Sequence, residues 1–155
     1  MRPVYQPRGK WFEELVAGDA WMSVGRTVTE TDIVNFAGVS GDFNPLHTDE
    51  VASAAGQFGG RVAHGMCGLS IATGLFERSG IVEGTIIGFV GIEMKFRAPV
   101  RIGDTIRLAY SVARARGGQG GEGGVVIFHG EVVNQDDEIV MDGHITTLVK
   151  SRPAG

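Results

Sequence analysis

The stretch from Gly65 to Phe76 most constrains what this chain can fold into, because none of its twelve residues is charged. Its length and its lack of regular alternation favour a helix over a strand. A helix that is apolar or small on every side is buried all round in a folded protein. Gly68, Ala72 and Gly74 would let other backbones approach it closely. The stretch therefore predicts a fully buried helix that the rest of the chain must cover.

The second half of the chain can supply that cover, because its hydrophobic pattern changes to a period of two after Gly84. Apolar residues alternate along 90–96 and 106–112, and the apolar stretches 125–133 and 139–149 follow. We interpret these as four long strands joined by short connections, which is typical of an antiparallel meander. Nothing else in the chain is large enough to cover the helix, so a single sheet has to wrap around it.

The first half adds shorter elements. Residues 21–28 predict a first strand, and residues 29–37 predict a short helix with Thr29 as its N-cap. A second short helix, over 49–55, would follow Thr48 as its cap. The predicted fold class is therefore α+β.

One glycine-rich motif does not indicate a nucleotide-binding site. Residues 118–123 formally spell GxGxxG, but they lie between two predicted strands rather than before a helix. The dinucleotide-binding interpretation needs the strand–turn–helix context, so we interpret this segment as a hairpin loop.

Length and composition limit the classes of protein. A chain of 155 residues is one domain by default, here 1–155, with residues 1–10 as an extended N-terminal arm. A net charge of −4 argues against broad nucleic-acid binding, and no run approaches the ~18 apolar residues of a membrane span. Cys67 is the only cysteine and cannot form an internal disulfide. We expect a cytoplasmic protein with neither nucleic-acid nor membrane partners.

The loop that holds Asp42 and His47 carries the residues best suited to chemistry. Gly41 and Pro45 restrict its shape. A carboxylate and an imidazole five residues apart across such a turn can hold a water between them, one group taking its proton and the other supplying one elsewhere. Asn44 offers an amide that could orient the pair or a substrate. In the alternative interpretation, Asp42 and Asn44 only form turns and His47 only packs.

The residues just before the predicted helix suggest a site for developing negative charge. Gly65 would lie in the first helical turn, where backbone N–H groups lack intrahelical partners and the helix dipole favours an oxyanion. Alternatively, Gly59, Gly60 and Gly65 only form a tight entry into the helix. His64 is a candidate ligand-facing residue, although a lone histidine is more often structural. Arg61 is a candidate for binding a phosphate or a substrate carboxylate.

Taken together, these motifs resemble the signature of the MaoC-like dehydratases, a family that includes (R)-specific enoyl-CoA hydratases. The resemblance covers most of the chain, through Phe36, Ser40-Gly41-Asp42, Asn44-Pro45-Leu46-His47, Ser53, Ala63-His-Gly-Met66 and the segment from Phe96 to Asp104.

The resemblance implies a hotdog fold, in which an antiparallel sheet wraps around a long central helix. The family's catalytic acid–base pair maps onto Asp42 and His47, and its asparagine maps onto Asn44. The oxyanion-binding N–H maps onto Gly65, and a hydroxyl in the central helix maps onto Thr73.

The implied activity is reversible hydration of 2-enoyl-CoA to (R)-3-hydroxyacyl-CoA. Coenzyme A, or an acyl-carrier protein, would then be part of the substrate, and no metal or other cofactor is expected. A homodimer or a higher homo-oligomer is also implied. An acyl-CoA thioesterase or a non-catalytic acyl-thioester-binding subunit are the alternatives.

Overall fold

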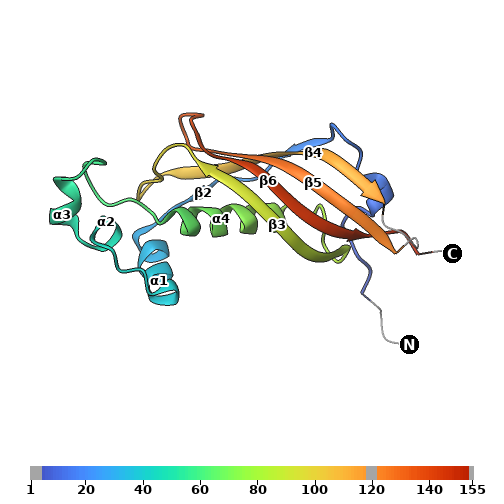
Figure 1. The fold of residues 1–155 in the computed structure, drawn as a ribbon, viewed down its shortest axis with the longest axis horizontal. Helices are drawn as coiled ribbons and strands as arrows, with labels where there is room; N and C mark the ends of the chain where they lie inside the picture. The colour runs from blue at the N-terminus through green and yellow to red at the C-terminus, as the bar shows by residue number, and fades with distance from the viewer. Residues whose placement is uncertain (1–4, 118–121, 154–155) are drawn as a thin grey trace.

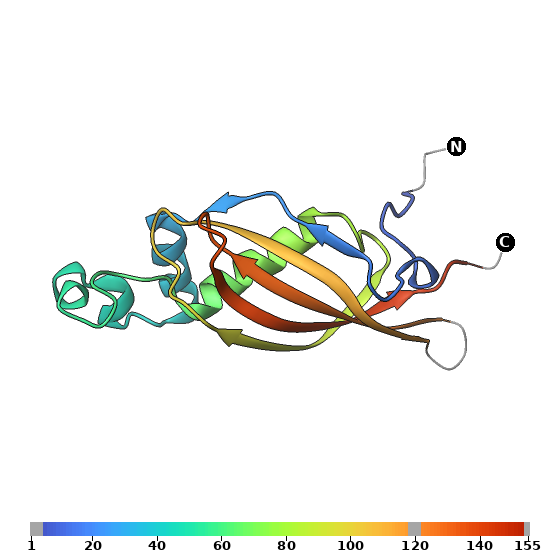
Figure 2. The ribbon, with the colours of Figure 1, turned by 90° about the horizontal axis from the view of Figure 1, so that it is seen from above.

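The computed structural model describes residues 5–117 and 122–153, which build an antiparallel sheet curved around one long helix (Figure 1). Three short helices project beyond one end of the sheet (Figure 2). The elements are η1 (Phe12–Glu14), β1 (Ala20–Met22), β2 (Arg26–Thr27), α1 (Glu30–Ser40), α2 (Pro45–Thr48), α3 (Glu50–Ala54), α4 (Gly65–Arg78), β3 (Ile86–Phe96), β4 (Thr105–Gly117), β5 (Gly123–Val133) and β6 (Ile139–Lys150). The predicted α+β class, with a sheet around a central helix, is confirmed.

The strand order corrects the predicted meander. Strands β4, β5 and β6 do form an antiparallel meander, but the sheet order is β1-β4-β5-β6-β3, so β3 pairs with β6 and not with β4. The connection over 97–104 is long enough to pass across the end of the sheet. It is held there by the bond from the Ala63 N–H to the Val100 carbonyl, 2.8 Å, and by a bridge between Val62 and Arg101.

Side-chain alternation holds in β4 and fails in β3. Ile106, Leu108 and other residues of the same parity in β4 are buried. In β3, register shifts between positions 86 and 88 and between 89 and 91 interrupt the alternation. Val90, Ile92 and Phe96 are 57%, 41% and 53% exposed, although Met94, which has the same parity, packs against the core. As the last strand in the sheet order, β3 leaves one edge of the sheet unpaired among the described strands.

The core lies between α4 and the concave face of the sheet. Leu69, Leu75 and Phe76 of α4 are buried there, and the Phe76 ring meets the rings of Tyr110 and Phe128 edge to face, with centroids 5.1 and 5.0 Å away. Full burial of one such side chain contributes about 1.5–3 kcal/mol to folding.

The prediction that this helix is buried all round is wrong. Met66, Ser70 and Gly74 form an exposed stripe along α4, because the sheet of one chain covers only the opposite side. Gly68 does meet the expected close approach. A Cβ atom built there would lie 3.0 Å from the Met141 methyl group.

The N-terminal half departs from the prediction in two places. The expected strand over 21–28 is interrupted and becomes β1 and β2, both paired with β4. The cap of α3 is Asp49, whose carboxylate accepts the Ala52 N–H at 2.9 Å, because Thr48 is the last residue of the preceding helix α2. Thr29 caps α1 as predicted.

Two predicted segments are only partly described. In the N-terminal arm, Gly9 and Lys10 donate backbone bonds to the carbonyls of Glu83 and Ile81. Most of the predicted hairpin loop, over 118–121, lies outside the described residues. Across the described parts of the chain, no helix is long and apolar enough to cross a membrane.

Candidate active site

The loop between α1 and α2 is shaped by its own sequence. Gly41 ends α1 with φ of 75°, in the left-handed region that favours glycine. The Asn44 side-chain oxygen then accepts the Leu46 N–H at 3.0 Å and caps α2, with Pro45 at the first helical position. Asp42 therefore lies in the loop, whereas His47 lies within α2. A short helix beginning at Pro45 was not predicted.

Asp42, His47 and His64 come together at one point. Ligand-type atoms of the three side chains all lie within 4.8 Å of one another. Asp42 is exposed, His47 is 9% exposed and His64 is 3% exposed. The carboxylate therefore meets solvent at the edge of a site whose two imidazoles are buried.

Hydrogen bonds to backbone carbonyls define the tautomers of both imidazoles. His47 Nδ1 lies 2.7 Å from the Val62 carbonyl oxygen, and His64 Nε2 lies 2.9 Å from the Asp42 carbonyl oxygen. A carbonyl only accepts, so each of these ring nitrogens carries the proton. The neutral His47 ring therefore has its lone pair on Nε2, where it can take up a proton.

The three residues are of types that bind transition metals, but the rings are arranged differently. The His47 and His64 rings stack with centroids 3.8 Å apart and planes inclined by 28°. A metal ion lies in the plane of each imidazole that binds it, at about 2.0–2.1 Å from the nitrogen. Two rings stacked this closely cannot both hold one ion in their planes. This geometry favours acid–base chemistry over metal binding.

The start of α4 lies beside the cluster. His64 is the N-cap residue and makes no side-chain cap bond, and Gly65 is the first helical residue. Within the described residues, the N–H groups of Gly65 and Met66 have no hydrogen-bond acceptor. The Phe96 ring lies against Gly65, 3.0 Å from where a Cβ atom would stand. The helix thus presents unpaired donors and its positive dipole end next to the two imidazoles.

A cavity of about 540 Å³ is lined by His47, His64 and Gly65, whereas Asp42 is not among its lining residues. Gly68 and Met141 line it as well. An apolar group could therefore lie against these residues while a polar group meets the helix terminus.

The other predicted site residues are placed elsewhere. The Thr73 hydroxyl donates to the Ser70 carbonyl at 2.8 Å, and Thr73 lies about 12 Å along the helix from Gly65, given the rise of about 1.5 Å per residue. In a single chain the structure therefore does not bring Thr73 to the cluster.

Arg61 forms ion pairs with Glu30 and Glu50 at 2.8 and 2.7 Å, which tie α1 to α3. Hydrogen bonds to these two carboxylates raise the pKa of Arg61 above its ordinary value.

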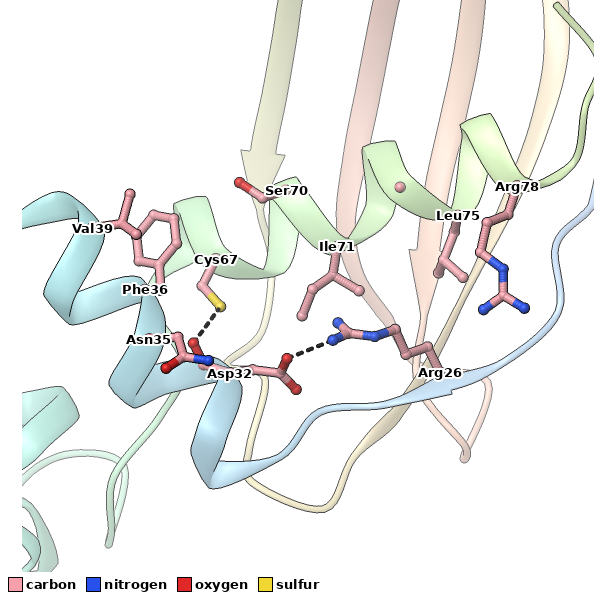
Figure 3. Close-up of a pocket in the computed structure, with 11 residues that line it drawn as sticks. Arg26, Asp32, Asn35, Phe36, Val39, Cys67, Ser70, Ile71, Leu75 and Arg78 are labelled. Carbon is pink, nitrogen blue, oxygen red and sulfur yellow. Dashed lines mark hydrogen bonds and ion pairs between the residues drawn. The ribbon is translucent and has the colours of Figure 1, made fainter. Parts of the chain in front are cut away.

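A second cavity of about 620 Å³ lies between α1 and α4 (Figure 3) and does not contain the cluster. Phe36 lines it, and the Phe36 ring also packs against His64 with centroids 5.0 Å apart. Cys67 lies in its wall, where burial raises the pKa of the thiol. This makes the thiol a poor nucleophile, although the cavity is the larger of the two.

Sequence reasoning did not find two contacts of the site. The Val62 carbonyl orients His47, and the Phe96 ring covers Gly65. Neither contact has a local sequence signal, because each joins residues from separate elements.

Comparison with known proteins agrees with this architecture. Residues 15–133 match the MaoC like domain. The (R)-specific enoyl-CoA hydratase of Rhodospirillum rubrum is 32% identical over 142 residues, which are 92% of this chain and 93% of that protein. The chain belongs to the MaoC-like dehydratase family.

Two further relatives differ in how much of their own length this chain of the MaoC-like dehydratase family matches. Protein MaoC of Klebsiella aerogenes is 43% identical over 109 residues, or 70% of this chain, but the match spans only 32% of that protein. The crystal structure of a monoamine oxidase regulatory protein from Archaeoglobus superposes with a TM-score of 0.88 at 36% identity, covering 96% of this chain and all of the other. The matched domain includes Asp42, His47 and Gly65 and ends with β5.

Proposed function

We propose that this chain is a hydro-lyase that adds water reversibly to 2-enoyl-CoA thioesters and yields (R)-3-hydroxyacyl-CoA. The observation that carries the proposal is the position of Asp42 and His47 around His64, the residue just before Gly65 and Met66. The N–H groups of these two residues have no acceptor among the described residues. Family relatives named as hydratases and dehydratases support the reaction class.

The proposed mechanism follows from where charge develops. A thioester carbonyl bound by the Gly65 N–H polarises the adjacent C=C bond, and the negative charge of the enolate-like state accumulates on its oxygen. Asp42 and His47 would activate a water for attack at C3, and one of them would return a proton to C2. His47 Nε2 is suited to this exchange, because Nδ1 is occupied by the Val62 carbonyl.

The partners of the reaction are inferred from the surroundings of the site. Arg97 lines the same cavity, and its side chain is 50% exposed although it pairs with Asp142. We infer that its guanidinium contacts the phosphates of coenzyme A or of a carrier-protein arm. The exposed apolar residues of β3 lie along a sheet edge with which none of the described strands pairs, and natural proteins usually cover such edges. We infer a homodimer joined through β3.

A single assay tests the activity against the alternatives. The protein is incubated with crotonyl-CoA while loss of the enoyl absorbance and release of free thiol are followed together. Hydration without thiol release supports the hydro-lyase. Thiol release indicates a thioesterase, and neither signal, with tight binding of the thioester, indicates a non-catalytic binding subunit.

Asp42→Asn tests the mechanism. The carboxylate is exposed and accepts only the Asn44 N–H at 3.2 Å among the bonds of the described residues, so its loss should leave the fold intact. We expect hydration to fall by about 10²–10⁴-fold, the contribution typical of a general acid or base. Wild-type turnover in this variant would contradict the mechanism.

A further inference from the structure

The contacts of His64 single it out among the polar residues of the site. It is 3% exposed, its ring stacks on His47 with centroids 3.8 Å apart, and the Phe36 ring packs against it. Its Nε2–H donates to the Asp42 backbone carbonyl, 22 residues away in the chain. One side chain therefore contacts both members of the proposed acid–base pair.

His64 is also anchored to the helix that offers the N–H donors. It is the N-cap residue of α4, and its carbonyl accepts the Gly68 N–H at 3.1 Å. Its backbone is thus held by the first turn of α4, while its side chain holds the loop of Asp42. His64 is therefore a direct link between the loop of Asp42 and the start of α4.

We infer that His64 is a positioning residue that sets Asp42 and His47 in register with the start of α4. The inference rests on the proposed hydration activity. The bond from Nε2–H to the Asp42 carbonyl sets the position of the loop, and the stacked ring limits rotation of His47. Placement of this kind matters because a misplacement of about 1 Å can cost about 10²-fold in rate.

The second ring nitrogen of His64, Nδ1, helps to distinguish a positioning role from a purely structural one. His64 Nδ1 is buried and has no hydrogen-bond partner among the described residues. Burying such an atom without a partner is destabilising, and a phenylalanine could stack in the same place without that cost. The hydrogen bond to the Asp42 carbonyl is the feature that a phenylalanine would lack.

Two variants separate the hydrogen bond from the ring. His64→Phe keeps an aromatic ring against His47 and loses the donor to the Asp42 carbonyl. His64→Gln loses the ring but keeps an amide N–H that can reach the same carbonyl. His144→Phe is the matched control, because His144 is exposed on the sheet and pairs with His129 instead.

We expect His64→Phe to lower kcat on crotonyl-CoA by about 100-fold, with KM within about threefold of wild type and a melting temperature that does not fall. His64→Gln should retain kcat to within about tenfold, and His144→Phe should resemble wild type. Equal losses in the Phe and Gln variants, full activity in His64→Phe, or failure of His64→Phe to fold would each overturn the inference.

A second measurement does not depend on activity. Long-range ¹H–¹⁵N correlation spectra of the wild-type imidazoles should show the proton of neutral His64 on Nε2 and that of neutral His47 on Nδ1. A proton on His64 Nδ1 would overturn the inference whether or not the enzyme hydrates crotonyl-CoA. If these tautomers are found and wild type lacks hydration, the proposed function fails while the arrangement of the rings stands.

Discussion

Replacing Gly65 by proline removes the proposed oxyanion donor while the helix keeps its start. Proline is well tolerated at the first helical position, where its missing N–H has no intrahelical acceptor to lose. The preceding residue, His64, has φ of −54° and ψ of 137°, the extended conformation that a following proline requires. The backbone is therefore already shaped for Gly65→Pro.

The expected fall in kcat follows from the atoms that the substitution at Gly65 adds and removes. A Cβ atom at Gly65 would stand 3.0–3.2 Å from three atoms of the Phe96 ring, but Phe96 is 53% exposed and can move aside. Gly65→Ala adds the same Cβ and keeps the N–H. The ratio of the two variants therefore measures the loss of the donor together with the ring atoms Cγ and Cδ that proline puts in its place. Loss of one oxyanion-hole donor typically costs about 10²–10³-fold in kcat, or about 2.7–4 kcal/mol.

The assay is hydration of crotonyl-CoA over a range of concentrations, together with thermal unfolding of both variants. We expect Gly65→Ala to keep kcat within about fivefold of wild type and Gly65→Pro to fall about 10²–10³-fold below Gly65→Ala, with similar melting temperatures. If the proline variant turns over within about threefold of the alanine variant, the Gly65 N–H does not stabilise the transition state.

Two further predictions concern stability and assembly. Burial tends to raise the pKa of Asp32, but hydrogen bonds from the Thr29 backbone and hydroxyl and from Arg26 outweigh it and hold that pKa below 3.8. Because the folded-state pKa is depressed, the stabilisation is present above about pH 4 and is lost as pH falls through the lowered value. Asp32→Asn should therefore lower the free energy of unfolding, measured in urea at neutral pH, by about 1–2 kcal/mol. The loss should become progressively smaller below pH 3.8. A loss that does not change with pH would contradict this prediction. Val90→Lys places a charge among the exposed apolar residues of β3. It should convert the inferred dimer to a folded monomer in sedimentation equilibrium, whereas the control Lys95→Glu on the same strand should leave the dimer intact. An unchanged mass for Val90→Lys would mean that the interface lies elsewhere.

Local sequence determined much of what the structure contains. The uncharged stretch from Gly65 formed the central helix. Alternation located β3 and β4, and apolar stretches located β5 and β6. Gly41 and Asn44 shaped the loop through backbone conformation and capping, which depend on residues close in the chain. For the same reason, the loop that brings Asp42 near His47 was recognisable before any coordinates.

Tertiary structure alone decided the other features of the fold and of the site, because these features depend on contacts between segments that are distant in the sequence. The pairing of β3 with β6 and the exposed stripe on α4 follow from how far one sheet can wrap around one helix. The ion pairs of Arg61 and the hydrogen bond from His64 to the Asp42 carbonyl join residues that are 11 to 31 positions apart. A local sequence pattern carries no information about contacts between residues so far apart in the chain. The sequence therefore supplied the reacting groups, and the packing of the elements supplied their arrangement.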